Sequence, residues 1–595
     1  MARKIRIACA VAAYNVMARC NQGRAIYADE RDRKLWLATQ GEACEKTGWF
    51  IHAWVMMNNA MGFSLPTPNQ SAPEYRFLIA DPAAPAYDFP NEKPDGNGFS
   101  RAPVRHPKHP SLERGWPPGH RGGGIPAATP GAQDVSDPFC EGTQLMGTGD
   151  IAGAEHALRQ ALARDPQLAE AHANLGLLLD GKGQHREAEG HYRRALEFSP
   201  HLVQTHINLG ALLAAQRRYA EAEEIYRRAL SLAPESPAAW SNLGVLLISV
   251  KREPEAERCF GRALASTPGY RSASFNLAYL LLRQGRYEEG WSCLESRGWH
   301  SPIKGYLDGF SRWQGESLEG KSLLIGAEAG YGDMIQFCRY AALIKRRGAA
   351  RISVYCHPGL KRLFASLVGV DEVLTSDQPL PVVCWDYWTL PLSMPFLFQT
   401  TLDTIPADLP YLTAEPERIM HWAGIVGDPQ AYLKVGLVWK GNPHFENNAD
   451  RSLPSLSALV PLKDLTGIRY FSLQKGTGEE ASCNDAPMPL MDLGAHIGDF
   501  ADTAAIVMNL DLVITVDTAV AHLAGALGKL TWVLLSDYMT DWRWLKDRQD
   551  SPWYPKVMRL FRQDNSGSWA TVIAEVKRAL QTLVEARGKP GRSSF

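Results

Sequence analysis

The feature that most constrains this chain is a repeat of 34 residues between about residues 135 and 304. One proline per copy marks its register without a slip, at Pro166, Pro200, Pro234, Pro268 and Pro302. Each copy also places a small residue four positions before a large apolar one, in the pairs Ala154/Leu158, Ala188/Tyr192, Ala222/Tyr226 and Ala256/Phe260. Residues four apart share a helix face, so the small residue lets a second helix approach and the large one fills the groove beside it. The repeat therefore predicts a row of helical hairpins.

This pattern resembles the tetratricopeptide repeat (TPR). Leu-Gly or Leu-Ala pairs mark the first helix of a copy at 175–176, 209–210, 243–244 and 277–278. We predict five copies, with poor first and last copies of the kind that cap a solenoid. The resemblance implies an all-α TPR solenoid.

One polar residue precedes each of those Leu-Gly or Leu-Ala pairs, at Asn174, Asn208, Asn242 and Asn276. Asparagine is a weak helix former, so helix propensity does not explain the series. Duplication of an ancestral repeat, which copies every residue, explains the four asparagines as well as a shared function does. In the O-linked N-acetylglucosamine transferases that these repeats resemble, such asparagines line the concave surface and hold an extended peptide, which an amide can do by donating and accepting hydrogen bonds.

After Pro302 short apolar runs alternate with amphipathic stretches. We expect strands at 322–326, 351–356, 435–439, 469–473, 510–516 and 530–535, a glycine-rich turn at 327–333 and a helix at 334–347. Continuous apolar strands that alternate with helices indicate parallel sheets covered on both faces, which bind ligands at the carboxyl ends of their strands. The charged stretch at 415–430 is expected to separate two such sheets.

The segment at 515–528 carries the most suggestive chemistry. Asp517 and Thr518 end an expected strand and can cap a helix that runs to Gly528, with His522 one turn inside. The amino terminus of a helix favours phosphate through its dipole and its unpaired N–H groups. A purely structural interpretation, with two capping residues and a satisfied histidine, fits this segment alone equally simply.

Three separated motifs together resemble glycosyltransferase family 9, the heptosyltransferase-like enzymes. They are the Gly330-Tyr-Gly-Asp333 turn, the strand and loop from Val435 to Asn442, and the string Asp-Thr-Ala-x-x-His-Leu-Ala-Gly-Ala-Leu-Gly that begins at Asp517. The resemblance covers about residues 305–585. It implies a GT-B fold with two Rossmann-like halves and inverting transfer from a nucleotide-diphosphate sugar.

By this resemblance, Asp333 is the general base for the acceptor hydroxyl, although a helix-capping role fits it as well. Asp517, Thr518 and His522 contact the phosphates and sugar of the donor, and Lys440, Asn442 and Arg451 supply cationic and amide donors to the diphosphate. Gln474 and Lys475 are weaker candidates. Ala519 stands where the heptosyltransferase loop has glycine, so a heptose donor is not assumed.

The chain contains no Asp-x-Asp motif, which suits an enzyme that needs no metal or other cofactor and neutralises the leaving diphosphate with helix dipoles and cations. The sequence thus favours a TPR-containing glycosyltransferase with a nucleotide sugar as co-substrate and a protein or glycan acceptor recruited by the concave TPR surface. Two alternatives remain open: a non-catalytic TPR scaffold with a degenerate GT-B domain, and a transposase-derived DNA-binding protein.

The second of these alternatives comes from the amino-terminal region, where residues 1–59 resemble the start of REP-associated single-tyrosine transposases. Those enzymes hold a metal on a His-aromatic-His strand, but this chain reads Ala60-Met-Gly-Phe63 there, so the metal ligands are absent. We interpret residues 1–65 as a truncated α+β fragment and consider DNA binding unlikely, because there is no strong basic patch.

Residues 66–134 hold 14 of the 39 prolines and predict an extended linker. The remaining expected boundaries are 135–304 for the TPR repeats, 305–413 and 414–585 for the two GT-B halves, and 586–595 for a disordered tail. The net charge of −1, ten cysteines without a CxxC pair, and the absence of a long apolar run favour a cytoplasmic protein with no membrane span. The apolar stretch at 5–13 is too short for a typical signal peptide.

Overall fold

The computed structural model describes residues 53–57, 60–64, 137–297, 301, 303–378, 380–381, 384–427, 432–443, 447–476 and 487–587. The chain divides into two compact units, residues 1–101 and 102–595. In the first unit, β1 (Ala53–Met57) pairs antiparallel with β2 (Ala60–Ser64), and Val55 lies opposite Gly62. Most of the transposase-like region, the proline-rich linker at 66–134 and the carboxy-terminal tail lie outside the described residues.

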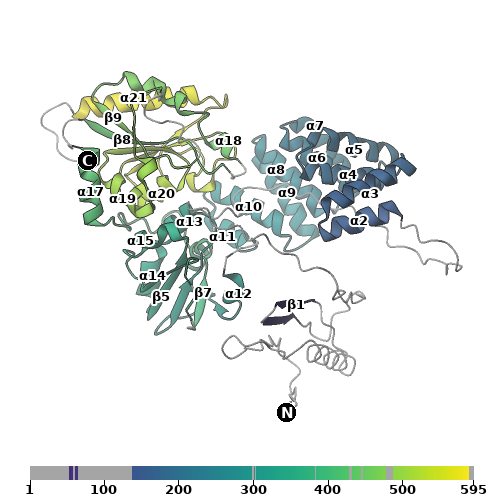
Figure 1. The fold of residues 1–595 in the computed structure, drawn as a ribbon, viewed down its shortest axis with the longest axis horizontal. Coiled ribbons are helices and arrows are strands. Elements are labelled where there is room, and N and C mark those ends of the chain that lie inside the picture. Colours follow the sequence, from purple (N-terminus) through teal and green to yellow (C-terminus); the bar gives the residue numbers. More distant parts are fainter. Residues whose placement is uncertain are drawn as a thin grey trace, which may run out of the picture. The chain divides into compact units, whose positions relative to one another are not determined.

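The second unit begins with five helical hairpins, as the 34-residue repeat predicts (Figure 1). Their helices are α2 (Pro138–Thr148) with α3 (Ile151–Arg164), α4 (Ala169–Gly181) with α5 (His185–Phe198), α6 (Val203–Ala215) with α7 (Tyr219–Leu232), α8 (Pro237–Ser249) with α9 (Glu253–Ser266), and α10 (Arg271–Arg283) with α11 (Tyr287–Leu294). The final helix has only 8 residues, against 14 for each of its counterparts α3, α5, α7 and α9. The last copy is therefore degenerate, as expected.

The small-to-large packing inside the repeats is confirmed. A Cβ added to Gly176 would lie 2.8 Å from the Tyr192 ring, and one added to Gly210 would lie 2.6 Å from the Tyr226 ring. The same contact recurs in the next hairpin between Gly244 and Phe260. The aromatic side chain of each second helix thus rests on the bare backbone of the first, and only glycine leaves room for it.

Two further regularities tie the repeats together. The ring nitrogens of His172, His206 and Trp240 bond the carbonyls of Pro166, Pro200 and Pro234 at 3.0, 3.0 and 2.7 Å. Arginines at the start of successive second helices also pair with a glutamate of the preceding repeat, as in Arg218–Glu189, Arg252–Glu223 and Arg286–Glu257. These contacts repeat at the 34-residue spacing and hold neighbouring hairpins in register.

The α/β region follows the hairpins and contains two all-parallel sheets. The first has the order β3-β7-β4-β5-β6 and the second the order β10-β9-β8-β11-β12-β13. Their strands are β3 (Ser311–Arg312), β4 (Ser322–Ile325), β5 (Arg351–Cys356), β6 (Glu372–Thr375), β7 (Tyr387–Thr389), β8 (Leu433–Val438), β9 (Ile468–Ser472), β10 (Met491–Asp492), β11 (Leu512–Val516), β12 (Thr531–Leu535) and β13 (Met558–Arg562). All six expected strands are present.

The helices of the α/β region depart from expectation at one place. The predicted helix at 334–347 is two helices, α13 (Tyr331–Phe337) and α14 (Tyr340–Arg346). Its first turn begins inside the predicted glycine-rich turn, because Gly330 adopts an extended conformation and caps the helix. The stretch at 415–430 does separate the sheets in sequence, but it contains helix α17 (Pro416–Val426).

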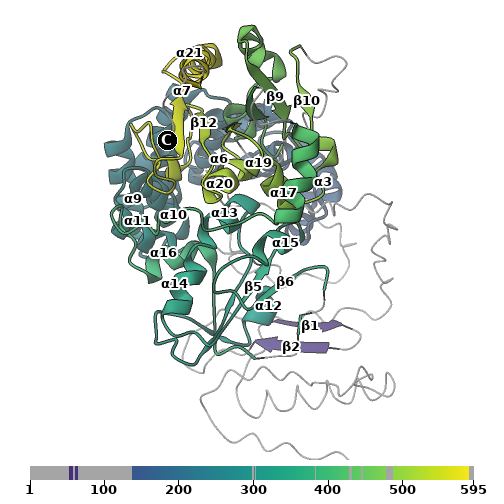
Figure 2. The same ribbon diagram turned by 90° about the vertical axis from the view of Figure 1, so that its left-hand side faces the viewer.

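Other helices complete the layers around the two sheets. They are α12 (Lys304–Leu307), α15 (Lys361–Phe364), α16 (Met394–Leu397), α18 (Asn448–Arg451), α19 (Phe500–Met508), α20 (Ala519–Ala526) and α21 (Trp569–Arg587), with short 3-10 turns that include η6 (Trp542–Trp544). In Figure 2, α13 and α20 lie between the two sheets. Among the described residues, no helix is long and apolar enough to cross a membrane.

The hydrophobic core does not divide where the repeats end. Buried apolar side chains of the first four hairpins, helices α2 to α9, form one cluster. The last repeat contributes Ala273 and Leu280 to this cluster, but it places Phe275, Tyr279, Tyr287 and Trp291 in the cluster that also holds residues of both sheets of the α/β region. The last repeat thus shares its core with the α/β region.

Candidate functional site

The strand order brings the predicted site residues to one place. Each sheet reverses its order beside the first strand of its parallel series, between β4 and β7 in the first sheet and between β8 and β11 in the second. Ligands of open parallel sheets bind at such switch points, beyond the carboxyl ends of the strands. Lys440 and Asp517 lie in the loops that follow β8 and β11, and Asp333 lies in α13, the helix that follows β4.

Helices α13 and α20 bring the two switch points together. A Cβ on Gly332 would lie 2.9 Å from the His522 ring, so the backbone of α13 rests directly on this histidine. The His522 ring stacks on Trp544 with 5.2 Å between ring centres, and its Nδ1 lies 2.9 Å from the Tyr554 hydroxyl. His522 is therefore a buried residue at the junction of the two sheets, one turn inside its helix as predicted.

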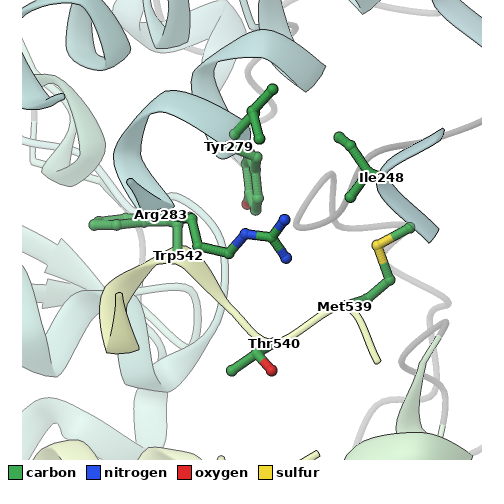
Figure 3. Close-up of a pocket in the computed structure, with 7 residues that line it drawn as sticks. Ile248, Tyr279, Arg283, Met539, Thr540 and Trp542 are labelled. Carbon is green, nitrogen blue, oxygen red and sulfur yellow. The ribbon is translucent and has the colours of Figure 1, made fainter. Parts of the chain in front are cut away.

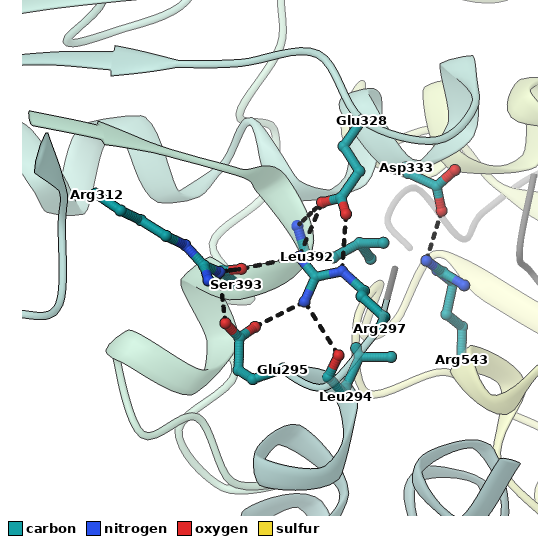
Figure 4. Close-up of polar contacts among 9 residues, drawn as sticks. All are labelled: Leu294, Glu295, Arg297, Arg312, Glu328, Asp333, Leu392, Ser393 and Arg543. Carbon is teal, nitrogen blue, oxygen red and sulfur yellow. Dashed lines mark hydrogen bonds and ion pairs between the residues drawn. The ribbon is translucent and has the colours of Figure 1, made fainter. Parts of the chain in front are cut away.

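Asp333 lies in the first turn of α13 with 1% of its surface exposed. Its Oδ2 accepts a hydrogen bond from the Gly330 amide at 2.7 Å, which confirms the capping role that the sequence left open. Its Oδ1 accepts from Arg543 at 2.6 Å, a contact across 210 positions of sequence (Figure 4). The carboxylate is thus held from both sides.

Arg543 is the centre of a buried polar cluster that the sequence did not reveal. Besides Asp333, it donates to both carboxylate oxygens of Asp541, at 2.9 and 3.0 Å, and to the side-chain oxygen of Gln336. Burial opposes its charge, but Asp541 and Asp333 more than offset this and raise the pKa of Arg543. Arginine is suited to this position because its planar fork can serve several acceptors at once.

Arg451, the last residue of α18, is the second arginine of the cluster and follows β8 of the second sheet. Burial lowers its pKa, and the charges of Asp517, Asp541 and Asp333 oppose that effect. A Cβ on Gly441 would lie 2.7 Å from its guanidinium, so the loop after β8 passes directly beside it. Three carboxylates and two guanidinium groups therefore meet in one small region.

Asp517 and Thr518 mark the start of α20. Burial and the nearby Asp541 raise the pKa of Asp517, against the opposing charges of Arg451 and Arg543. Thr518 begins the helix, but its side chain makes no capping bond to the helix backbone. Its hydroxyl lies 2.9 Å from that of Thr515 instead. The expected side-chain cap by Thr518 is therefore wrong. The helix begins where predicted and ends at Ala526, two residues before the predicted end at Gly528.

The remaining donor candidates lie at the edge of this cluster. The Lys440 amide donates to the side-chain oxygen of Gln474 at 2.9 Å, and the Gln474 amide returns a bond to the Lys440 carbonyl at 3.2 Å. Gln474 is buried and fixes the loop after β8, whereas Asn442 is exposed. The Lys475 ammonium group donates to the carbonyl of Ile497. Gln474 thus has a clear structural role.

The four asparagines of the repeats lie in the first helices of their hairpins. Each is buried, with 0 to 4% of its surface exposed. Contacts run between neighbouring repeats from Asn174 to Thr143 and from Asn276 to Ser241, both at 3.4 Å, while Asn208 accepts from Gln204 at 3.1 Å. Peptide binding by these asparagines stays a prediction.

Several residues of the cluster were missed at the sequence level: Arg543, Asp541, Trp544, Tyr554 and Gln336. One signal was available, because Asp541-Trp-Arg-Trp544 places an arginine between two tryptophans directly after an acidic residue. Tryptophan is large and rarely placed without packing partners, so this string indicated a buried arginine. Among the described residues, no group of three or more His, Cys, Asp or Glu side chains is placed to hold a metal ion.

Comparison with known proteins supports the helical part. Family models described as tetratricopeptide repeat match residues 141–202, 213–270 and 252–290. The five hairpins are tetratricopeptide repeats. The curated protein FlbA of Caulobacter vibrioides is 27% identical over 328 residues, which cover 50% of this chain and 53% of that protein. The chain thus spans about half the length of this relative.

Solved structures also align with part of this chain. The structure titled as a functional characterisation of Pseudomonas aeruginosa PilF is 26% identical, with a TM-score of 0.26, over 27% of this chain and 75% of that one. YrrB, whose title describes a TPR protein with an unusual peptide-binding site, is 20% identical, with a TM-score of 0.24, over 27% and 82% of the two chains. Both alignments cover only about a quarter of this chain.

Proposed function

We propose that the α/β region is a GT-B glycosyltransferase that transfers a sugar from a nucleotide-diphosphate donor, with inversion and without a metal, to an acceptor recruited by the TPR repeats. The observation that carries the proposal is the meeting of Asp333, Arg451, Asp517 and His522 where the two sheets reverse their order. Asp333 belongs to one motif of family 9 and Asp517 and His522 to another, and Arg451 follows shortly after the third motif, which ends at Asn442. Their convergence supports the proposal.

In this proposal the donor diphosphate lies beyond β8 and β11. Arg451 supplies positive charge, and the first turn of α20 supplies its dipole to the leaving group. As the acceptor oxygen attacks the anomeric carbon, the bond to the diphosphate breaks and its electron pair leaves with the phosphate. A base takes the proton of the acceptor hydroxyl.

Asp333 is the candidate for this base, and its environment sets a condition. Both carboxylate oxygens are engaged, one by the Gly330 amide and one by Arg543. To accept a proton from an acceptor, Asp333 exchanges its contact with Arg543 for the acceptor hydroxyl. Arg543 then keeps Asp541 as its partner, so its charge stays compensated.

The same burial of Asp333 favours the second candidate function, a non-catalytic TPR scaffold. An aspartate that caps a helix and pairs with a buried arginine has a sufficient structural role without catalysis. In that case the α/β region serves to hold the last repeat, and the repeats bind partner proteins. The two candidates differ in whether the chain binds and consumes a nucleotide sugar.

The test is calorimetric titration of the full chain with a panel of uridine, guanosine, adenosine and thymidine diphosphate sugars. The proposal expects saturable binding of one donor and at least a tenfold weaker Kd in Arg451→Ala. The matched control is Arg469→Ala, because Arg469 is exposed on β9, at the opposite end of the same sheet. Asp333→Asn is expected to keep donor affinity and lose turnover. A folded wild-type protein that binds none of these donors contradicts the proposal and leaves the scaffold.

A further inference from the structure

The loop that leads into α13 is held by a buried arginine from the end of the last repeat. Arg297 lies just after α11 and donates through Nε and Nη2 to the two carboxylate oxygens of Glu328, at 2.7 and 3.0 Å (Figure 4). Both residues are 5% exposed. Glu328 stands five positions before Asp333, in the loop that follows β4. A two-pronged bond of this kind fixes orientation as well as distance.

The surroundings of this pair leave the loop little freedom. Arg297 also donates to the Ser393 hydroxyl at 2.8 Å and to Glu295 at 2.7 Å, and the Leu392 amide donates to Glu328 at 3.4 Å. Ala329 next to Glu328 has a φ of 61°, in the left-handed region that few residues other than glycine adopt. The loop therefore depends on its contacts to keep this shape.

A second chain of contacts links the last repeat to Asp333, and it runs through η6. Trp542 of η6 packs on Tyr279 and Arg283 of α10 around a small cavity, which Met539 and Thr540 close from the loop before η6 (Figure 3). The Trp542 ring also meets Trp291 of α11 edge-on at 5.2 Å. The next residue along η6 is Arg543, which holds Asp333.

We propose that the last repeat is a positioning part of the candidate catalytic site, in which Arg297 sets the loop through Glu328 and α10 sets Asp333 through η6 and Arg543. This inference rests on the proposed function and extends it, because it makes the acceptor-recruiting repeats part of the site. A binding partner that shifts α10 or α11 would therefore change the position of Asp333 through Arg297 and Glu328 and through η6 and Arg543. Arg297 and Arg543 are positioning residues in this account, and Asp333 is the catalytic one.

The test compares two variants of the full chain with a matched control. Glu328→Gln keeps the shape of the side chain but removes the negative charge that pairs with Arg297. Arg543→Lys keeps the positive charge but loses the planar guanidinium group that serves several acceptors at once. Glu257→Gln is the control, because Glu257 pairs with Arg286 of the last repeat and does not contact the loop. Donor binding stoichiometry, measured by titration, normalises kcat to the folded fraction in each protein.

We expect kcat per donor site to fall at least tenfold in Glu328→Gln and in Arg543→Lys, with the donor Kd within twofold of wild type. Glu257→Gln should change neither value by more than twofold. If Glu328→Gln does not fold, Arg543→Lys carries the test. Variants that keep the wild-type kcat, or that lose kcat and donor affinity by the same factor, overturn the inference. A wild type that binds no donor refutes the proposed function instead.

The dependence of kcat on pH separates a positioning role of Arg543 from a general loss of stability, which would not change the pH at which kcat falls. The charged and titratable groups that interact with Asp333 include Arg543, Arg451 and Tyr279, with Asp541 beside them. Arg543→Gln removes the nearest cation, which favours the protonated carboxyl. The acid limb of kcat should therefore move to higher pH by about one unit or more. An unmoved acid limb in a variant that still turns over contradicts a role for Arg543 at Asp333.

Discussion

The middle repeats and the last repeat share one 34-residue pattern but bury it against different partners. In the three middle repeats, helices α4 to α9, the aromatic side chain of each second helix rests on a glycine of the first helix, as Tyr226 does on Gly210. The last repeat has Ala278 at the glycine position and places Tyr287 and Trp291 in the core of the α/β region. The repeat period thus determines the hairpin, whereas the residues that depart from it determine what the hairpin packs on.

The largest expected effect comes from Trp291, which is 1% exposed and donates to the Thr400 carbonyl at 2.8 Å. Trp291→Ala removes this bond and its ring contacts with Trp542 and Trp553. We expect a loss of about 3–5 kcal/mol in the free energy of unfolding of the α/β region. Urea denaturation followed by circular dichroism measures it, with Phe198→Ala as the control, because Phe198 is 40% exposed. Equal losses in the two variants would mean that the last repeat is no more tightly integrated than the others.

A smaller effect is expected inside the middle repeats. Gly210→Ala places a methyl group 2.6 Å from the Tyr226 ring, and we expect a cost of about 1–3 kcal/mol in stability from this overpacking. Gly261→Ala is the matched control. A Cβ there meets no atom within 4 Å, so the better helix propensity of alanine should stabilise α9 by about 0.5–1 kcal/mol. If Gly210→Ala is as stable as wild type, close packing on glycine does not hold the middle repeats.

A partly buried histidine in α5 should make the stability of the repeats depend on pH. Burial and the neighbouring His172 lower the pKa of His191 from 6.5 to about 4, and the two Nδ1 atoms lie 2.8 Å apart. Between pH 6.5 and 4 the unfolded chain binds the proton more readily, so stability should fall as the pH is lowered through this window.

Isoleucine stands at the equivalent position of the next repeat, Ile225. His191→Ile should therefore show a smaller fall in Tm than wild type when the pH is lowered from 6.5 to 4. The difference between the two proteins, measured by thermal denaturation in matched buffers, isolates this histidine from the carboxylates. Identical pH dependence would show that His191 titrates as an ordinary histidine.

The smallest effect is expected where the two kinds of repeat are alike. Arg286 of the last repeat and Arg252 of a middle one each pair with a glutamate of the preceding repeat at 2.8 Å, on partly exposed surface. Arg286→Ala and Arg252→Ala should each cost only about 0.2–1 kcal/mol, and less at high salt. A much larger loss in Arg286→Ala alone would extend the special role of the last repeat to its surface.

The sequence predicted the fold where a local rule repeats. The five hairpins follow from the 34-residue spacing, and the strands before Asp333, Lys440 and Asp517 follow from short apolar runs. The strands missed are β3, β6, β7, β10 and β13, because they are short or carry charged residues such as Glu372, Arg559 and Arg562 that hide the apolar pattern.

The candidate site was predictable in its members but not in its contacts. The family motifs place Asp333 and His522 on loops and helix starts, yet their partners Arg543 and Tyr554 are 210 and 32 positions away. Nothing local to Asp333 indicates a guanidinium beside it, since pairing over such distances is set by the packing of α13, α20 and η6. The link from Arg297 to Glu328 was hidden for the same reason, because it joins two regions that the sequence treats separately.

Hydrogen exchange followed by mass spectrometry, on the wild type and Trp291→Ala, tests most directly whether the last repeat holds the candidate site. The account predicts faster exchange in α10 and α11 and also in residues 327–337 and 541–545, with α4 to α7 unchanged. Faster exchange confined to α10 and α11, with the Asp333 loop and η6 as protected as in the wild type, would contradict it.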